Sequence, residues 1–156
     1  MKIYDCFMYF NEDLLTDLRL NILDNYVTKF IITEAEYTHN GTKKKLNFNI
    51  NNFSKFKNKI EYIVVDKEPP NIKQLNKNDS PDERGRKLIF NGYSRDIHQR
   101  NALSKGLQDL NSEDLIIISD LDEIPNLENI DFEMIKDEIL LFKQKIFYYK
   151  FNLCYN

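Results

Sequence analysis

Four short apolar runs, each ending at a polar or acidic residue, constrain the fold of this chain more than any other feature. They cover residues 3–10, 30–32, 60–65 and 115–118. Between the first two lies a segment whose leucine and isoleucine residues recur at helical spacing, which predicts a helix. Strands that alternate with helices are typical of an α/β sheet with parallel pairs. The sequence therefore predicts an α/β fold with a mostly parallel central sheet flanked by helices.

The other segments give less regular patterns. Residues 67–86 are polar and contain three prolines, which predicts a long loop that is either a lid or an unstructured surface excursion. A helix is predicted from about residue 94 to residue 110, with Arg100 in the middle of its apolar face. The uninterrupted apolar run 115–118 predicts a central strand that is covered on both faces. A short helix, and then one or two strands within 139–151, complete the prediction.

The composition suits one soluble domain of ordinary size. The 156 residues are 42% hydrophobic, which is enough for a sizeable core, and 30% charged. A net charge of −3 argues against a broad surface for nucleic acid. The start of the chain lacks the apolar core of a signal peptide, and no stretch approaches the roughly 20 apolar residues of a membrane span. We therefore expect a cytoplasmic protein with no nucleic-acid partner and no membrane span. Cys6 and Cys154 are expected to be small core residues, because free cysteine is commonly buried.

The residues after the fourth apolar run carry the strongest functional signal. Asp120, Asp122 and Glu123 follow Ser119 closely, and ligands of open α/β sheets bind beyond the carboxyl ends of strands. Alternate residues of an extended segment point the same way, so Asp120 and Asp122 are expected to converge, with Leu121 turned inward. Two close carboxylates favour a divalent cation between them, and their hard oxygens suit Mg²⁺ or Mn²⁺, which also bridge phosphates. The alternative is a solvated acidic turn.

Five further residues are candidates for binding a nucleotide ligand together with Asp120. Arg100 needs a partner on its apolar helix face, which is either a carboxylate of the acidic cluster or a nucleotide phosphate. Asn101 adjoins it, and Arg95, one turn earlier, is either a further ligand contact or an exposed charge. Glu34 ends the second strand, where it either hydrogen-bonds a ribose or base edge or is simply exposed. Asp5 lies within the first strand, where an acid needs a partner or a ligand.

Other common site patterns are missing from the sequence. His39 and His98 have no partners at metal-ligand spacing, so both are expected to be surface or hydrogen-bonded histidines. Residues 43–45 form a short lysine run of the kind that is usually a solvated loop. With only four glycines, the chain has neither a glycine-rich dinucleotide motif nor a P-loop.

Several blocks of residues, taken in order, also resemble a known family. They are Asp5-Cys6-Phe7 with Phe10-Asn11-Glu12, Leu18-Arg19-Leu20-Asn21-Ile22-Leu23, Phe30-Ile31-Ile32-Thr33-Glu34-Ala35, Tyr37-Thr38-His39-Asn40-Gly41, His98-Gln99-Arg100-Asn101-Ala102-Leu103 and Ile118-Ser119-Asp120-Leu121-Asp122-Glu123-Ile124-Pro125. Together they resemble glycosyltransferase family 17, the family of the β-1,4-mannosyl-glycoprotein 4-β-N-acetylglucosaminyltransferases, whereas residues 67–93 match poorly. The resemblance implies a GT-A-like nucleotide-sugar-binding fold, a UDP-GlcNAc donor and a divalent metal. It also implies that Asp120 and Asp122 bind the metal and that Arg100 belongs to the donor site.

The function expected from these residues and this resemblance is the transfer of N-acetylglucosamine from UDP-GlcNAc to a glycan or other sugar acceptor. The resemblance implies inversion, which needs a base to deprotonate the acceptor. Glu123 is the nearest acid, and the base is left unassigned. Domains of the family continue beyond the Asp120 motif, so residues 1–156 are expected to be a single glycosyltransferase domain without the acceptor-binding part. The alternatives are a non-catalytic nucleotide-sugar-binding module and a metal-dependent phosphatase in which Asp120 is the nucleophile.

Overall fold

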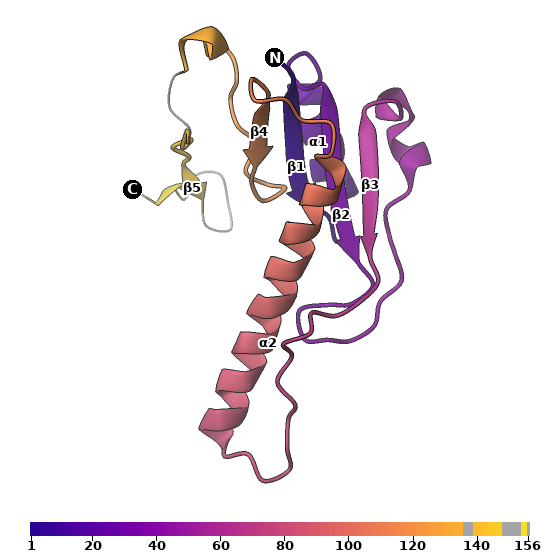
Figure 1. The fold of residues 1–156 in the computed structure, drawn as a ribbon, viewed down its shortest axis with the longest axis vertical. Coiled ribbons are helices and arrows are strands. Elements are labelled where there is room, and N and C mark those ends of the chain that lie inside the picture. Colours follow the sequence, from indigo (N-terminus) through magenta and orange to yellow (C-terminus); the bar gives the residue numbers. More distant parts are fainter. Residues whose placement is uncertain (136–138, 148–153, 156) are drawn as a thin grey trace. The chain divides into compact units, whose positions relative to one another are not determined.

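The chain forms two units, which are described separately. The computed structural model describes residues 1–135, 139–147 and 154–155. The first unit is Met1–Asp122 and the second is Glu123–Asn156. Figure 1 shows the helices and strands of both units, coloured along the chain. The first unit holds the main sheet and the pocket.

A four-stranded, wholly parallel sheet lies at the centre of the first unit (Figure 1). Its strands, in the order β3-β2-β1-β4, are β1 (Ile3–Met8), β2 (Lys29–Ala35), β3 (Ile60–Val65) and β4 (Leu115–Ile118). In this register Asp5 of β1 lies between Phe30 of β2 and Ile117 of β4. Because all four strands run the same way, their carboxyl ends meet at one edge of the sheet. The prediction of an α/β fold with a parallel sheet is confirmed.

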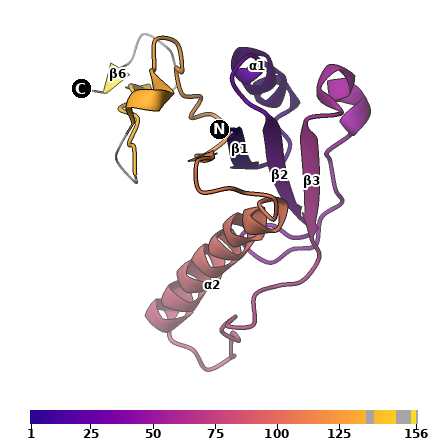
Figure 2. The same ribbon diagram turned by 45° about the horizontal axis from the view of Figure 1, so that its top comes forward.

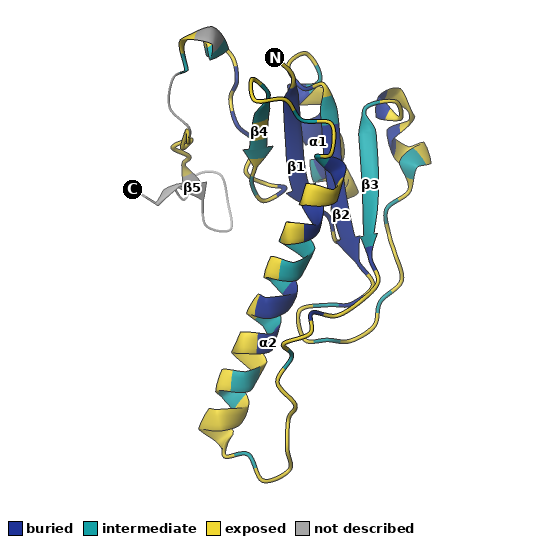
Figure 3. Ribbon diagram, in the orientation of Figure 1, coloured by how far each residue is buried: buried dark blue, intermediate teal, exposed yellow. Residues whose placement is uncertain are grey.

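The prediction that residues 115–118 form a central strand is wrong. β4 lies at one edge of the described sheet, and its Ile116 and Ile118 are 41% and 56% exposed. The central positions belong to β1 and β2, which are the most buried strands in Figure 3. Isoleucine favours extended backbone in edge and central strands alike, because its branched side chain fits the pleated surface in both. An apolar run therefore predicts a strand but not its place in the sheet.

Two helices belong to connections between parallel strands, and these two connections run in opposite directions along the sheet. Helix α1 (Asp13–Leu23) connects β1 to β2, as predicted, and α2 (Pro81–Asn101) lies between β3 and β4 in the sequence. Right-handed crossovers in opposite directions put helices on opposite faces of a sheet. Figure 2 shows α1 and α2 on opposite sides of the strands. A 3₁₀ helix, η1 (Ile50–Phe56), packs against α1.

The predicted boundaries of the second long helix are wrong at both ends. α2 begins at Pro81, because Ser80 caps it by accepting a hydrogen bond from the backbone N of Glu83 (3.2 Å) and proline suits the first helical turn. The helix ends at Asn101, and the chain then tightens into the 3₁₀ helix η2 (Ala102–Gly106). Gly106 lies so close to β2 that a Cβ atom there would come within 2.7 Å of Ile31. The apolar face predicted for residues 94–110 is therefore divided between α2 and η2.

The second unit is described only in part. It contains the 3₁₀ helix η3 (Phe132–Met134) and an antiparallel pair, β5 (Ile146–Phe147) with β6 (Cys154–Tyr155). The short helix predicted after residue 125 corresponds to η3, and β5 falls within the predicted strand region 139–151, whose last four residues lie outside the described part of the chain. Cys6 is buried in the core of the first unit, as predicted. Among the described residues, no helix is long and apolar enough to cross a membrane.

Candidate functional site

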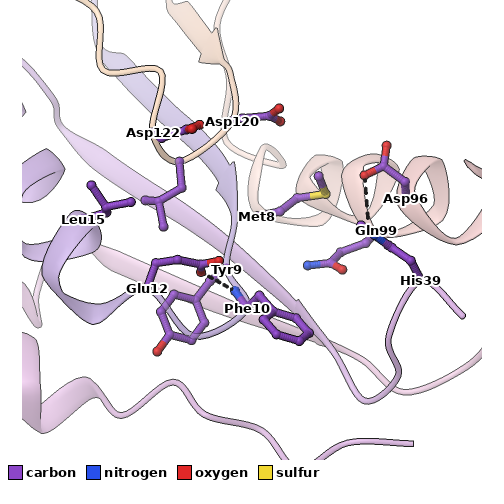
Figure 4. A pocket seen from close by; sticks show the side chains of 11 residues that line it. Met8, Tyr9, Phe10, Glu12, Leu15, His39, Asp96, Gln99, Asp120 and Asp122 are labelled. Carbon is purple, nitrogen blue, oxygen red and sulfur yellow. Dashed lines mark hydrogen bonds and ion pairs between the residues drawn. The ribbon is translucent and has the colours of Figure 1, made fainter. Parts of the chain in front are cut away.

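A pocket of about 470 Å³ opens at the carboxyl edge of the sheet. Its lining comes from the end of β1 and the segment after it, from α1 and α2, from the loop after β2 and from the turn after β4 (Figure 4). The lining residues are Met8, Tyr9, Phe10, Glu12, Leu15, His39, Asp96, Gln99, Asp120, Leu121 and Asp122. Four of these carry carboxylates, so the pocket is acidic on several sides.

The position of the pocket follows from the sheet topology. From β1 the chain continues on one side through β2 to β3, whereas β4 pairs with the other side of β1. The strand order therefore reverses between β1 and β4, and ligands of open α/β sheets bind outside the carboxyl ends of strands at such a reversal. Residues that follow β1 and β4 line the pocket, as this rule requires.

Asp120 and Asp122 lie on the same wall of the pocket, in the turn after β4 (Figure 4). Leu121 between them is buried, so the alternation expected from the sequence is present. Oδ1 of Asp120 accepts a hydrogen bond from Nη2 of Arg100 (2.8 Å). Glu123, the acid that follows, is the first residue of the second unit.

Asp120 and Asp122 could hold a cation only together with ligands from outside the protein. Within the described part of the chain, no group of three or more His, Cys, Asp or Glu side chains is arranged to hold a metal ion. Mg²⁺ usually takes only one or two protein carboxylates and completes its shell with water and substrate phosphates. Asp120 and Asp122 therefore suit Mg²⁺ or Mn²⁺ bound together with a diphosphate, rather than a cation enclosed by protein ligands.

Arg100 has the carboxylate partner that the sequence left as one of two alternatives. Besides the bond to Asp120, its Nη2 lies 3.8 Å from Oδ2 of Asp96, one helical turn earlier. The Arg100 side chain is 36% exposed, so it is not the buried arginine expected on an apolar face. Asn101, the last residue of α2, is exposed and does not line the pocket.

Arg95 is buried, which excludes the alternative of an exposed charge. Its Nε donates to Oε1 of Glu68 (3.0 Å), and its Nη1 donates to the backbone carbonyl of His39 (3.0 Å). The guanidinium lies against Gly41, where a Cβ atom would come within 2.5 Å of Nη2 and where φ is +85°. Arg95 thus fixes the loop that carries His39 to the pocket, and it does not itself line the pocket.

Asp5 and Glu34 are fully buried and do not line the pocket. Asp5 forms an ion pair with Arg19 at 2.7 Å. Burial raises the pKa of the Asp5 carboxyl, and the hydrogen bonds from Arg19 oppose that shift. Glu34 accepts hydrogen bonds from the backbone N of Asn47 (2.8 Å) and of Phe48 (3.0 Å).

Two side chains also donate to Glu34, so its surroundings are those of a buried structural acid rather than the exposed strand end considered above. The Tyr62 hydroxyl donates at 2.8 Å, and the Lys44 ammonium forms an ion pair with Oε1. Burial, followed by the hydrogen bond to Glu34, raises the pKa of the Tyr62 hydroxyl.

The sequence did not identify several residues of the pocket. Asp96 and Gln99 lie three positions apart on α2, and Arg100 is four positions after Asp96, so helical spacing was a signal that could have grouped them. His39, expected at the surface, is exposed but lies at the pocket, with Nε2 3.8 Å from Oδ1 of Asp96. Glu12 also lines the pocket, and its Oε2 accepts hydrogen bonds from the backbone N of Phe10 (3.0 Å) and of Asn11 (2.8 Å).

Comparison with known proteins agrees with the resemblance seen in the sequence. The profile of Glycosyltransferase family 17 matches residues 1–156. The proteins named β-1,4-mannosyl-glycoprotein 4-β-N-acetylglucosaminyltransferase from Homo sapiens and Rattus norvegicus are each 28% identical to the chain over 127 residues. These matches cover 79% of this chain but only 22% and 21% of the two relatives, so the chain spans about a fifth of their length. No solved structure matches the chain.

Proposed function

Since this chain belongs to glycosyltransferase family 17, we propose that its pocket binds UDP-GlcNAc and that it transfers N-acetylglucosamine to a hydroxyl group of a sugar acceptor. The transferred sugar is taken from the name of the relatives, which are N-acetylglucosaminyltransferases, and UDP is the nucleotide implied by the family resemblance. The observation that carries the proposal is the place of the Asp120–Asp122 turn at the strand-order reversal, on the wall of a 470 Å³ pocket.

Asp120 and Asp122 would hold Mn²⁺ or Mg²⁺ together with the diphosphate of the donor. Such a cation, when bound, neutralises the negative charge that develops on the diphosphate leaving group. The protein residues supply the geometry, because both carboxylates belong to one short turn whose Leu121 is anchored in the core. This arrangement predicts that nucleotide and metal bind together and that neither binds tightly alone.

Arg100 does not line the pocket, but it contacts two carboxylates that do, so it is well placed to meet a phosphate bound beside them. It lies beside Asp120 and Asp96, and its planar guanidinium offers several donors at once. A bound diphosphate would compete with Asp120 for these donors. Replacing the Arg100–Asp120 ion pair costs little free energy, since exposed ion pairs contribute only about 0–1 kcal/mol to stability.

Inversion at the anomeric carbon would require a base that accepts the proton of the acceptor hydroxyl. Asp96 and Glu12 are the pocket carboxylates outside the Asp120–Asp122 turn, and Glu123 remains a candidate from the sequence. Glu12 accepts two backbone hydrogen bonds at 3.0 and 2.8 Å, whereas Asp96 lies 3.8 Å from Arg100 and from His39, and these looser contacts favour Asp96 over Glu12 for proton transfer. The family match gives no support to the phosphatase alternative.

A donor-turnover assay tests the proposal. UDP release from UDP-GlcNAc should require Mn²⁺ or Mg²⁺, should be faster with an acceptor oligosaccharide, and should be lost in Asp122→Asn. UDP-glucose, which differs only in the sugar, and GDP-mannose, which differs in both sugar and base, serve as controls that share the diphosphate. UDP binding without turnover under all these conditions would leave a nucleotide-sugar-binding module, and equal turnover without metal would contradict the role of the Asp120–Asp122 turn.

A further inference from the structure

We infer that Arg19 is a positioning residue that fixes the turn formed by residues 119–121 and thereby aims the carboxylates of Asp120 and Asp122 into the pocket. The inference deepens the proposed function, because what the carboxylates bind is taken from that function. The role of Arg19 in the conformation of the turn is argued from its hydrogen bonds alone.

The Arg19 side chain reaches three consecutive residues of the turn from helix α1. Its Nη1 donates to the backbone carbonyl of Asp120 (2.8 Å) and to that of Leu121 (3.2 Å). Its Nη2 donates to Oγ of Ser119 (2.7 Å). The turn has no regular secondary structure of its own, so these bonds connect it directly to the helix.

Asp5 fixes the orientation of the guanidinium from the opposite side. Oδ2 of Asp5 accepts from Nε of Arg19 (2.8 Å), and Oδ1 accepts from Nη2 (2.7 Å). Both side chains are fully buried, and the guanidinium carbon lies 4.8 Å from the centre of the Phe7 ring. A two-point contact of this kind fixes the plane of an arginine, because its donors form a rigid fork. Asp5 lies on β1, so these bonds connect the turn to one of the two central strands of the sheet.

The distribution of the donors distinguishes positioning from simple charge neutralisation. Neutralising Asp5 requires only the contacts to its two oxygens, yet the remaining donors of Arg19 point to Ser119, Asp120 and Leu121. A buried ion pair is often no more stable than well-packed apolar residues of the same size. The pair therefore has a clearer role in holding the acidic turn in one conformation than in stabilising the fold.

Arg19→Lys separates these roles, because lysine keeps the positive charge beside Asp5 but lacks the planar fork. In the whole 156-residue chain, we expect the backbone order parameters of residues 119–122 to fall from about 0.85 to below about 0.6. We expect the affinity for UDP in the presence of Mn²⁺ to fall about tenfold, which corresponds to about 1.4 kcal/mol. Leu23→Ala is the matched control, since it alters a fully buried residue of the same helix and leaves the donors of Arg19 in place. It should lower the melting temperature without changing the order parameters of the turn or the UDP affinity.

Ser119→Ala keeps the experiment decisive if Arg19→Lys does not fold. It removes one of the three contacts to the turn and leaves the Asp5–Arg19 pair intact, so we expect the same changes at smaller size, about threefold in UDP affinity. Unchanged order parameters in both variants would overturn the inference, and so would a flexible turn with unchanged UDP affinity. If the unaltered protein binds no UDP with Mn²⁺, the proposed function fails, and the order parameters alone then decide whether Arg19 fixes the turn.

Discussion

Arg100 donates a hydrogen bond of 2.8 Å from Nη2 to Oδ1 of Asp120 and so joins the end of α2 to the turn after β4. The two side chains are 36% and 55% exposed, so water screens the pair. An exposed pair contributes about 0–1 kcal/mol to stability. The contact is therefore weak enough for the proposed donor diphosphate to replace it.

Arg100→Lys should weaken UDP binding in the presence of Mn²⁺ by about tenfold and change the melting temperature by no more than a few degrees. Lysine keeps the charge but loses the planar fork that grips two phosphate oxygens at once. Calorimetric titration and thermal melts on one preparation measure both effects. Arg86→Lys, the same change at an exposed position of α2, is the control. A large loss of stability with unchanged UDP affinity would assign Arg100 a structural role instead.

UDP should stabilise the protein only when a divalent cation is present. A ligand that binds the folded state alone raises the free energy of unfolding by about 2.7 kcal/mol at a hundredfold excess over its dissociation constant. Thermal melts with UDP, with and without Mn²⁺, test this expectation, and EDTA should reverse the effect. Equal shifts in both conditions would show that the nucleotide binds without a metal bridge.

The fold was predictable from the sequence where local pattern and tertiary position agree. Apolar periodicity predicted β1, α1, β2 and β3, since each of these elements follows its own local signal. β4 shows the limit of this reasoning, because pairing with β1, rather than its own apolar residues, decides that it is an edge strand. The start of α2 carried a capping signal in Ser80 and Pro81, which the prolines of the preceding loop concealed.

The site was predictable in part for similar reasons. Asp120 and Asp122 follow a strand, so a general rule for parallel sheets placed them at the correct edge. Asp5 and Glu34 obey the same rule of an acid near a strand, yet both are buried and bonded to Arg19 and to Lys44. The burial of an acid and its ion-pair partner are decided by the folded chain, and the residues adjacent to Asp5 and Glu34 in the sequence do not predict either.

Glu34→Gln should destabilise the protein by about 3 kcal/mol, because a buried charge partner is removed while Lys44 and its neighbours remain. An amide cannot accept from the two backbone donors, from Tyr62 and from Lys44 as a carboxylate does. Urea unfolding measures the loss. Glu36→Gln, at an exposed position just after β2 and two residues beyond Glu34, should cost less than about 0.5 kcal/mol. Equal effects of the two changes would contradict the structural role of Glu34.

Cys6 should resist alkylation in the folded protein. Burial, the largest cause, and the charge of Asp5 raise the pKa of the Cys6 thiol from 9.0 to about 12, so little thiolate forms at pH 8. The folded state holds this proton more tightly than the unfolded state, so the contribution of Cys6 to stability is present below pH 9 and is lost as the pH rises toward 12. Iodoacetamide labelling followed by peptide mass spectrometry should modify Cys6 only in denaturant. Rapid labelling of the native protein at pH 8 would contradict its burial.

Calorimetric titration of UDP into Asp122→Asn in the presence of Mn²⁺ tests whether the turn after β4 is the metal and donor site. The substitution keeps the size of the side chain and removes the charge that a cation needs, and it relieves the repulsion between Asp120 and Asp122 in the absence of metal. Asp66→Asn is the control, since Asp66 is an exposed acid after β3 and does not line the pocket. We expect Asp122→Asn to melt no lower than the unaltered protein and to lose Mn²⁺-dependent UDP binding, while Asp66→Asn keeps it. Unchanged Mn²⁺-dependent affinity in Asp122→Asn would mean that this turn is only a solvated acidic surface.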